Sequence, residues 1–162
     1  MADDLLIATR HALSEELDSA LSRIEHCLSQ LTDEQTWWRP LPDMNAIGNL
    51  VLHLAGNVEQ LIVSVVGGKP DNRNRPAEFA ARGSIPKAEL LARLKTSVEN
   101  ARQTISGVQA VELCRVRRFR DSDWTGMQAI VRSVAHFRGH TQEIIHQTRT
   151  ILGERYQFAG MK

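Results

Sequence analysis

The sequence predicts an all-α protein, namely a four-helix bundle with long crossover connections. Four long stretches repeat apolar residues at steps of three and four, which is the spacing of an amphipathic helix. No stretch alternates apolar and polar residues for long enough to form a sheet. The connections in the middle of the chain are long enough to cross the bundle rather than to join neighbouring helices by a tight turn.

The first helix is predicted to begin near Asp3 or Asp4, whose negative charges suit a helix N-terminus. It ends before TDEQTWWRPLPDM, where Pro40 and Pro42 cannot continue a helix. Its apolar positions recur on one face and are Leu13, Leu17, Leu21, Ile24, Leu28 and Leu31.

The second helix is predicted to start with Asn45 as its N-cap and to end at Gly67-Gly68. Its apolar face consists of Ile47, Leu50, Val51, Leu54, Val58, Leu61, Ile62 and Val65. The stretch GGKPDNRNRPAEFAARG follows, and its content of Gly, Pro, Asn and Arg is typical of a loop.

The third helix is predicted to begin with Ser84 as cap and Pro86 in its first turn, and to continue to about Gly107. The next segment, VELCRVRRFRDSDWTG, is expected to hold a short extended piece. The fourth helix runs from about Gly126 to Leu152, with apolar residues again at helical spacing.

Composition narrows the class of protein. The 162 residues suit a single domain over 1–162, with 42% hydrophobic and 24% charged residues. A net charge of +1 gives no reason to expect a nucleic-acid or membrane partner. Two cysteines fit neither a paired metal motif nor a disulfide framework, and the acidic N-terminus lacks the features of a secretory signal. We therefore expect a cytoplasmic protein.

Three histidines form a candidate metal site. His136 and His140 are four residues apart, so they lie one turn apart on one face of the fourth helix. His53 lies on the second helix, and all three sit at the margins of their apolar stripes, where neighbouring helices meet. Three histidines plus water is the composition of a catalytic zinc centre. Spacing alone leaves open a second interpretation, half-buried polar histidines, which is the commoner case.

Several polar residues and three further histidines lie near these positions in the sequence. Asn49 and Asn57 beside His53, and Ser133 and Glu143 beside the pair, are candidates for orienting the imidazoles. Phe137 occupies the place of the catalytic glutamate in HExxH, so the chain is not a zincin. The remaining histidines are expected to be structural or on the surface, and they are His11, His26 and His146.

Two further features have competing interpretations. Trp37-Trp38 is expected to cover the end of the bundle, and the alternative is a wall of a substrate pocket. The arginines between Arg115 and Arg120 can bind an anionic group, but Asp121 and Asp123 follow at once, so a solvated, self-compensating loop is the favoured prediction.

The order of these motifs resembles the DinB-like (DinB/YfiT) superfamily of metalloenzymes, in an uncharacterised bacterial branch. The matching stretches are TWWRPLPDMNAIGNLVLHLAGN, RPAEFAARG followed by IPKAEL, and HFRGHTQEI. The resemblance implies a four-helix bundle with two crossovers, a homodimer, and a divalent metal held by His53, His136 and His140. The chain departs from the Gly-Gln pair that often follows the last ligand in relatives, so only the ligands are carried over.

The resemblance implies a function in the transfer of low-molecular-weight thiols such as mycothiol, bacillithiol or glutathione. We therefore expect a metal-dependent S-transferase with zinc or nickel and a small-molecule substrate. Glu143 is the candidate catalytic residue, as a proton acceptor or as a carboxylate that orients a ligand. The alternatives are a metal-dependent hydrolase on the same ligands and a non-catalytic bundle that binds metal or dimerises.

Overall fold

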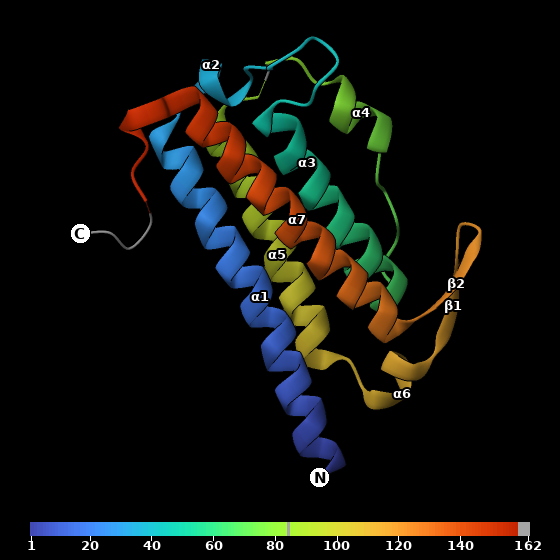
Figure 1. Cartoon of the computed structure of the whole chain (residues 1–162). Helices are drawn as coiled ribbons and strands as arrows, with labels where there is room; N and C mark the ends of the chain where they lie inside the picture. The colour runs from blue at the N-terminus through green and yellow to red at the C-terminus, as the bar shows by residue number, and fades with distance from the viewer. Residues whose placement is uncertain (84, 159–162) are drawn as a thin grey trace.

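The computed structural model describes residues 1–83 and 85–158, and four long helices dominate it (Figure 1). They are α1 (Ala2–Gln30), α3 (Ile47–Val58), α5 (Lys87–Gly107) and α7 (Gly126–Leu152). Helix α3 continues without a break into the π-helix η1 (Glu59–Val66). The predicted all-α bundle is confirmed, and the bounds predicted for the fourth helix are those of α7.

The helices are arranged so that α1 and α3 are each packed against both α5 and α7. Residues 67–83, here called the crossover segment, take the chain back along the bundle, so that α3 and α5 run in the same direction (Figure 1). The connection from α5 to α7 stays at the other end of the bundle. The chain therefore uses long connections, as the sequence predicts.

The core lies between the four long helices and is formed by the apolar stripes that the sequence predicts. Burial of these side chains is the main favourable term in folding. The largest side chains with no more than a trace of exposure are Leu17, Ile24, Ile47, Leu50, Leu54, Ile62, Leu90, Leu94, Ile105, Ile130, Phe137 and Ile144.

The helix starts differ from the predictions in two places. Ala46, and not Asn45, is the N-cap of α3, and the side chain of Asn49 accepts a hydrogen bond from its backbone N–H at 3.1 Å. Pro86 is the N-cap of α5 rather than part of its first turn. Ser84, the predicted cap, lies outside the described residues.

Three short helices occupy segments that the sequence does not predict as helical. They are α2 (Asp33–Thr36), α4 (Arg75–Ala80) and α6 (Ala110–Cys114). Helix α4 is capped by Asn74, whose side chain accepts from the N–H of Ala77 at 3.2 Å, and Pro76 lies in its first turn. Helices of four to six residues are too short to show an apolar period, which is why they were missed.

The extended piece expected before the fourth helix is a hairpin of β1 (Val116–Phe119) and β2 (Ser122–Thr125), paired antiparallel. Two of its arginines have carboxylate partners, and one of these partners is among the aspartates that the sequence predicts. Arg118 lies 3.3 Å from Asp123, and Arg117 pairs with Glu112 of α6. The segment is therefore largely self-compensated in charge.

One helical stretch among the described residues, Ile47–Val66, is long and apolar enough to cross a membrane by length and composition. Its buried share is 56% of the window examined, and its apolar face packs into the centre of the bundle. The stretch is therefore accounted for as a core helix of this fold.

Candidate metal centre

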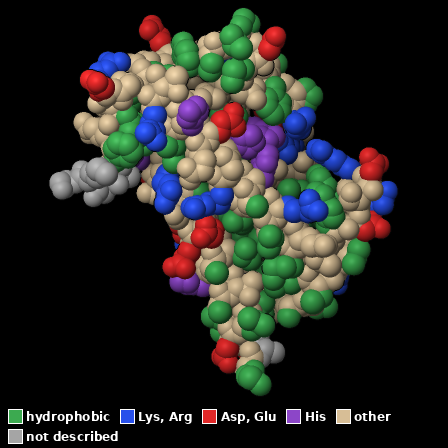
Figure 2. Space-filling model, viewed as in Figure 1, with side chains coloured by type: hydrophobic (Ala, Val, Ile, Leu, Met, Phe, Trp, Pro, Cys, Tyr) green, Lys and Arg blue, Asp and Glu red, His purple; other side chains and the backbone are tan. Residues whose placement is uncertain are grey.

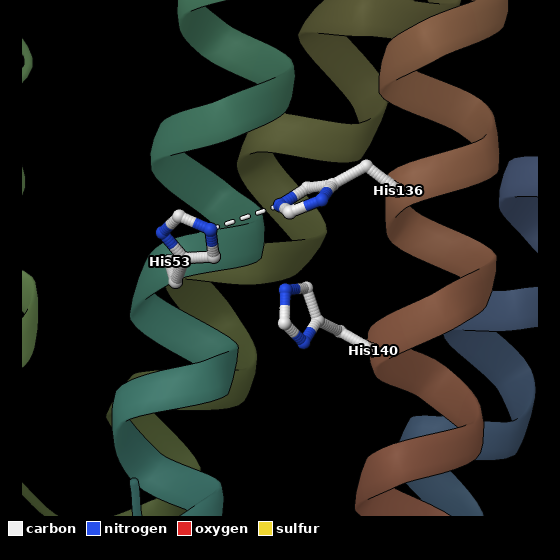
Figure 3. A group of neighbouring side chains, drawn as sticks. All are labelled: His53, His136 and His140. Atoms are coloured by element: carbon white, nitrogen blue, oxygen red, sulfur yellow. Dashed lines mark hydrogen bonds between the residues drawn. The ribbon is translucent and has the colours of Figure 1, made fainter.

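The three predicted histidines lie together, between the middle of α3 and the middle of α7 (Figure 3). Nε2 of His53 lies 2.9 Å from Nε2 of His136. The ring centroids of His53 and His140 are 5.3 Å apart, and those of His136 and His140 are 4.5 Å apart. One ligand nitrogen from each ring lies within 4.8 Å of the others. The convergence predicted from helical spacing is confirmed.

Packing of α7 fixes the direction of its two histidines. Phe137, between them in sequence, is fully buried in the core. Because successive residues of a helix are about 100° apart, this anchors the neighbouring face, which carries His136 and His140, against α3. Both rings stay partly accessible, and Figure 2 shows histidine side chains at the surface beside acidic and basic ones.

His53 is deeper than its predicted place at a stripe margin, with 6% of its surface exposed. The crossover segment covers it. The ring of Phe79 packs 4.8 Å from the ring of His53, and the guanidinium of Arg75 lies over the Phe79 ring at 4.9 Å. Helical periodicity could not show this cover, because it depends on where a loop returns.

Glu78 of α4 binds the far side of the His53 ring. Its Oε2 lies 3.0 Å from Nδ1 of His53. Nη2 of Arg73 is also 3.0 Å from this nitrogen, but its two N–H groups have acceptors in Oε2 of Glu78 at 2.9 Å and in the backbone carbonyl of His53 at 3.4 Å, whereas the ionised carboxylate of Glu78 can only accept. Nδ1 of His53 therefore carries the proton and donates it to Glu78. This tautomer leaves the lone pair of Nε2 facing the other histidines.

Arg73 and Glu78 form a bidentate pair, with Nε of Arg73 donating to Oε1 of Glu78 at 2.7 Å. Nη1 of Arg73 also donates to the side chain of Gln60 at 3.0 Å. Burial by itself would raise the pKa of Glu78, but hydrogen bonds from Arg73 and His53 and the charge of Arg73 outweigh it and lower that pKa below its usual value. Glu78 is therefore an anion at neutral pH.

Glu143, the predicted catalytic residue, binds His140. Its Oε2 lies 2.7 Å from Nδ1 of His140, and the two side chains are 40% and 25% exposed. The carboxylate thus occupies the same place on His140 that Glu78 occupies on His53. This contact supports the orienting role among the two that the sequence left open.

The neighbourhood of His136 keeps its imidazole neutral. Burial, followed by the nearby rings of His140 and His53 and then the charges of Arg73 and Arg75, lowers the pKa of His136 to about 4. A metal binds the neutral form of histidine, so at neutral pH this ligand offers a lone pair without competition from protons.

Three of the polar residues that the sequence offers as orienting groups form hydrogen bonds elsewhere. Asn49 contacts the backbone of the crossover segment, where its Nδ2 donates to the carbonyl of Glu78 at 2.8 Å. The hydroxyl of Ser133 donates to Oδ1 of Asn57 at 2.9 Å and so links α7 to α3. These side chains position the helices and the crossover segment rather than the imidazole rings.

The donor set fits a divalent ion. Tetrahedral coordination with bonds of about 2.0–2.1 Å places ligand nitrogens roughly 3.3 Å apart. The histidine nitrogens, at separations from 2.9 Å up to 4.8 Å, bracket this value. Three imidazoles from two helices, two of them with a carboxylate on the ring nitrogen opposite the cluster, are a donor set that could hold such an ion.

Glu78 and Arg73 are the functional candidates that sequence reasoning missed. They lie in the stretch whose composition predicts a loop, and a loop's destination is not encoded in its local pattern. One signal was present in α3. A Cβ atom added at Gly56 would lie 2.2 Å from Oε1 of Glu78 and 2.8 Å from Nε of Arg73. A glycine inside an apolar helix often marks such a close approach.

The remaining sequence candidates lie away from this centre. Nε1 of Trp37 donates to the carbonyl of Ile85 at 2.8 Å, and the indole packs against Gly48, so Trp37 covers the bundle as predicted for the pair, whereas Trp38 is exposed. His11 pairs with Glu15 on the exposed face of α1, and the ring of His26 forms a hydrogen bond with the backbone carbonyl of Gln157. None of these side chains takes part in the three-histidine cluster.

A cavity of about 840 Å³ lies beneath the crossover segment, between α3 and α5. Arg73 and Glu78 line it together with Gly56, and its wall is apolar near Leu52 and Ile85. The Arg73–Glu78 pair therefore contacts the histidine cluster through His53 and also lines the cavity.

Comparisons with known proteins give a family and a fold. A family model described as a protein of unknown function (DUF1572) matches residues 8–161. A crystal structure of a conserved protein from Enterococcus faecalis superposes with a TM-score of 0.76 at 20% sequence identity. The match covers 88% of this chain and 96% of that one, and at this identity it shows the fold alone. No curated protein matches the sequence.

Proposed function

We propose a function for this chain, which belongs to the DUF1572 family of proteins of unknown function: a divalent-metal-dependent enzyme whose ion is held by His53, His136 and His140. The observation that carries the proposal is the convergence of the three rings, with Nδ1 of His53 and of His140 each bound by a carboxylate. Carboxylates in this position fix the ring and raise its basicity as a ligand. Half-buried polar histidines without a metal role do not require such an arrangement.

Zinc or nickel is the proposed ion, since imidazole nitrogens suit both. When bound by three histidines, such an ion leaves positions for an exogenous ligand and lowers the pKa of a thiol or water placed there. The protein charges around the site balance, because Arg73 neutralises Glu78 and the charge of Arg75, which lies over Phe79, is offset by Glu143 on His140. The charge of the divalent ion itself would therefore be what favours an anionic ligand.

Thiol transfer is the reaction that we favour, in line with the resemblance to DinB-like enzymes. In this reaction the thiol would lose its proton to solvent, and the thiolate would form a C–S bond as the leaving group departs from the electrophile, so no protein base is required. The carboxylates of Glu78 and Glu143 are each engaged with a ligand imidazole. A hydrolase benefits from a nearby carboxylate that accepts a proton from water, and these two contacts reduce the support for it.

Elemental analysis of the protein, purified without a histidine tag, tests the proposal. We expect one divalent ion per chain in the wild type, and a loss of metal in His53→Ala and His140→Ala. His146→Ala removes an exposed histidine outside the cluster and is the matched control. Absence of stoichiometric metal, with unchanged melting temperature in both ligand variants, would remove the enzyme hypothesis.

Activity assays then separate the remaining alternatives. The metal-loaded protein is incubated with glutathione, bacillithiol or mycothiol and a fluorogenic electrophile, and thioether formation is compared with His140→Ala. Hydrolysis of an activated ester without any thiol would favour the hydrolase. Bound metal with neither reaction, across these probes, would favour a non-catalytic metal-binding bundle.

The homodimer, which the same resemblance implies, and the cytoplasmic location, which composition and the N-terminal sequence lead us to expect, remain proposals. Apolar side chains on the N-terminal turns of α1 are available for association, since Leu5 is 70% and Ile7 is 61% exposed. Light scattering coupled to size exclusion measures the mass in solution, and a monomer at all concentrations tested would contradict the dimer.

A further inference from the structure

Arg73 and Glu78 are not among the candidate metal ligands, but both contact one of them, His53. Both residues belong to the crossover segment, whereas the histidines belong to α3 and α7. We propose that they are positioning residues that hold His53 in its ligand orientation, and that a bound ion in turn fastens the crossover segment to α3. This inference rests on the metal site proposed above.

The carboxylate of Glu78 is fixed from several directions. Arg73 holds it through bonds of 2.7 and 2.9 Å, and Asn49 holds the carbonyl of the same residue at 2.8 Å. The pair is buried, with 5% of the Arg73 side chain and 10% of the Glu78 side chain exposed. A carboxylate held this firmly fixes the rotation and the tautomer of His53. Glu143 is more exposed and lies on the same helix as its partner, and within residues 1–83 and 85–158 no other segment holds its carboxylate by a hydrogen bond.

Gly56 is the residue of α3 that allows this approach. Because an added Cβ would lie 2.2 Å from Oε1 of Glu78, any other residue at position 56 has to displace the carboxylate. A substitution here therefore moves the pair without removing a charge from either residue. A substitution at Gly56 therefore tests the position of the Glu78 carboxylate, whereas Glu78→Gln tests its charge.

The coupling has to work in both directions. If the placement of Glu78 raises the affinity of the site for an ion by some factor, the ion raises the stability of that placement by the same factor. The crossover segment also forms one wall of the 840 Å³ cavity, through Arg73, Ala77, Glu78 and Ala81. Metal occupancy would therefore be linked to the stability of this wall of the cavity.

The test measures zinc affinity by chelator competition in the full-length protein and in two variants, Gly56→Ala and Glu78→Gln. We expect binding ten- to a hundred-fold weaker in both variants, the range typical for loss of a group that orients a ligand. Gly139→Ala on α7 is the matched control, because a Cβ there meets nothing within 4 Å. Its zinc affinity is expected to equal that of the wild type.

Hydrogen exchange supplies a second measurement. Zinc is expected to increase the protection of amides in residues 74–81 of the wild type, and not in Glu78→Gln at saturating zinc. This readout does not depend on activity. It also keeps the proposal testable if Gly56→Ala does not fold.

The outcomes are distinguishable. A wild type that binds no zinc overturns the metal site and this inference with it. Wild-type binding with equal affinity in both variants overturns the positioning role alone. The role is also overturned if the variants lower only the melting temperature of the zinc-free protein, since Arg73 and Glu78 would then be purely structural.

Discussion

Nε2 of His136 and Nε2 of His53 face each other at 2.9 Å, a distance at which one nitrogen has to carry a proton. Nδ1 of His53 carries the ring proton and donates a hydrogen bond to Glu78, so Nε2 of His53 has a free lone pair. Nε2 of His136 is therefore the donor in the bond between the two rings. An ion bound by Nε2 of both rings requires His136 to hold its proton on Nδ1 instead. Metal binding in this mode would therefore change the tautomer of His136.

This relationship predicts a spectroscopic change. In the metal-free protein at neutral pH, ring carbon and nitrogen chemical shifts of His136 are expected to report the Nε2–H tautomer. Addition of one equivalent of zinc should convert them to the Nδ1–H tautomer, whereas His53 keeps its proton on Nδ1 throughout. A metal-free His136 already in the Nδ1–H form would contradict this reading of the contact.

The stability of the metal-free protein should fall in mild acid. The folded protein holds the pKa of His136 at about 4, below the ordinary value of about 6.5, so the unfolded chain takes up this proton first as the pH falls. The stabilisation is fully present above about pH 6.5 and is lost as the pH falls to about 4, on the order of 2–3 kcal/mol. Urea denaturation with chelator present measures it, and His136→Asn should flatten this part of the profile.

Glu143→Gln distinguishes orientation from proton transfer. If Glu143 only orients His140, glutamine can keep a weaker hydrogen bond, and zinc affinity should fall by about tenfold or less with turnover little changed. A large loss of turnover with zinc affinity preserved would instead assign the proton-acceptor role. Glu15→Gln, which alters the exposed pair with His11, is the matched control.

Phe137→Ala should be the most destabilising change on α7. The ring is fully buried between the two histidines of that helix, and removal of a buried phenyl ring costs about 3–5 kcal/mol. Val131→Ala, an exposed position on the same helix, is expected to change stability by less than about 0.5 kcal/mol. Equal effects of the two substitutions in denaturant titrations would contradict the packing described for α7.

Thr125→Ala should cost about 1 kcal/mol through the first turn of α7. The hydroxyl of Thr125 accepts from the N–H of Gln128 at 3.1 Å, and the side chain of Gln128 accepts from the N–H of Thr125 at 2.8 Å. Thr125→Ser retains this capping box and should restore most of the loss. Zinc affinity should be unchanged, since His136 lies three turns farther along the helix.

The sequence predicts the helices well and the covering segment poorly, for a physical reason. Apolar stripes on long helices, such as the one that ends at Leu152, recur often enough to define an element and the face it buries. The same logic places His136 and His140 on one face. It also selects His53, because the margin of one stripe meets the margin of the next.

The parts that were missed depend on contacts between distant segments. Glu78 reaches His53 only because residues 67–83 return along the bundle, and no local pattern records that return. The start of α3 was misplaced because Asn45 has a good capping side chain, while the bond is made by Asn49 from inside the helix. The start of α3 is thus stabilised by an asparagine side chain, as predicted, but the asparagine is Asn49 rather than Asn45.

The separation of the ligands along the chain has a thermodynamic consequence. His53 and His136 are 83 residues apart, and both cysteines, Cys27 and Cys114, are free thiols. An ion shared by these two histidines would close a loop of that length and act as a reversible cross-link. A covalent link across such a loop would raise the free energy of unfolding by about 4–5 kcal/mol. It would do so by lowering the conformational entropy of the unfolded chain rather than by adding native contacts. A chelator would then do to this protein what a reductant does to a disulfide-stabilised one.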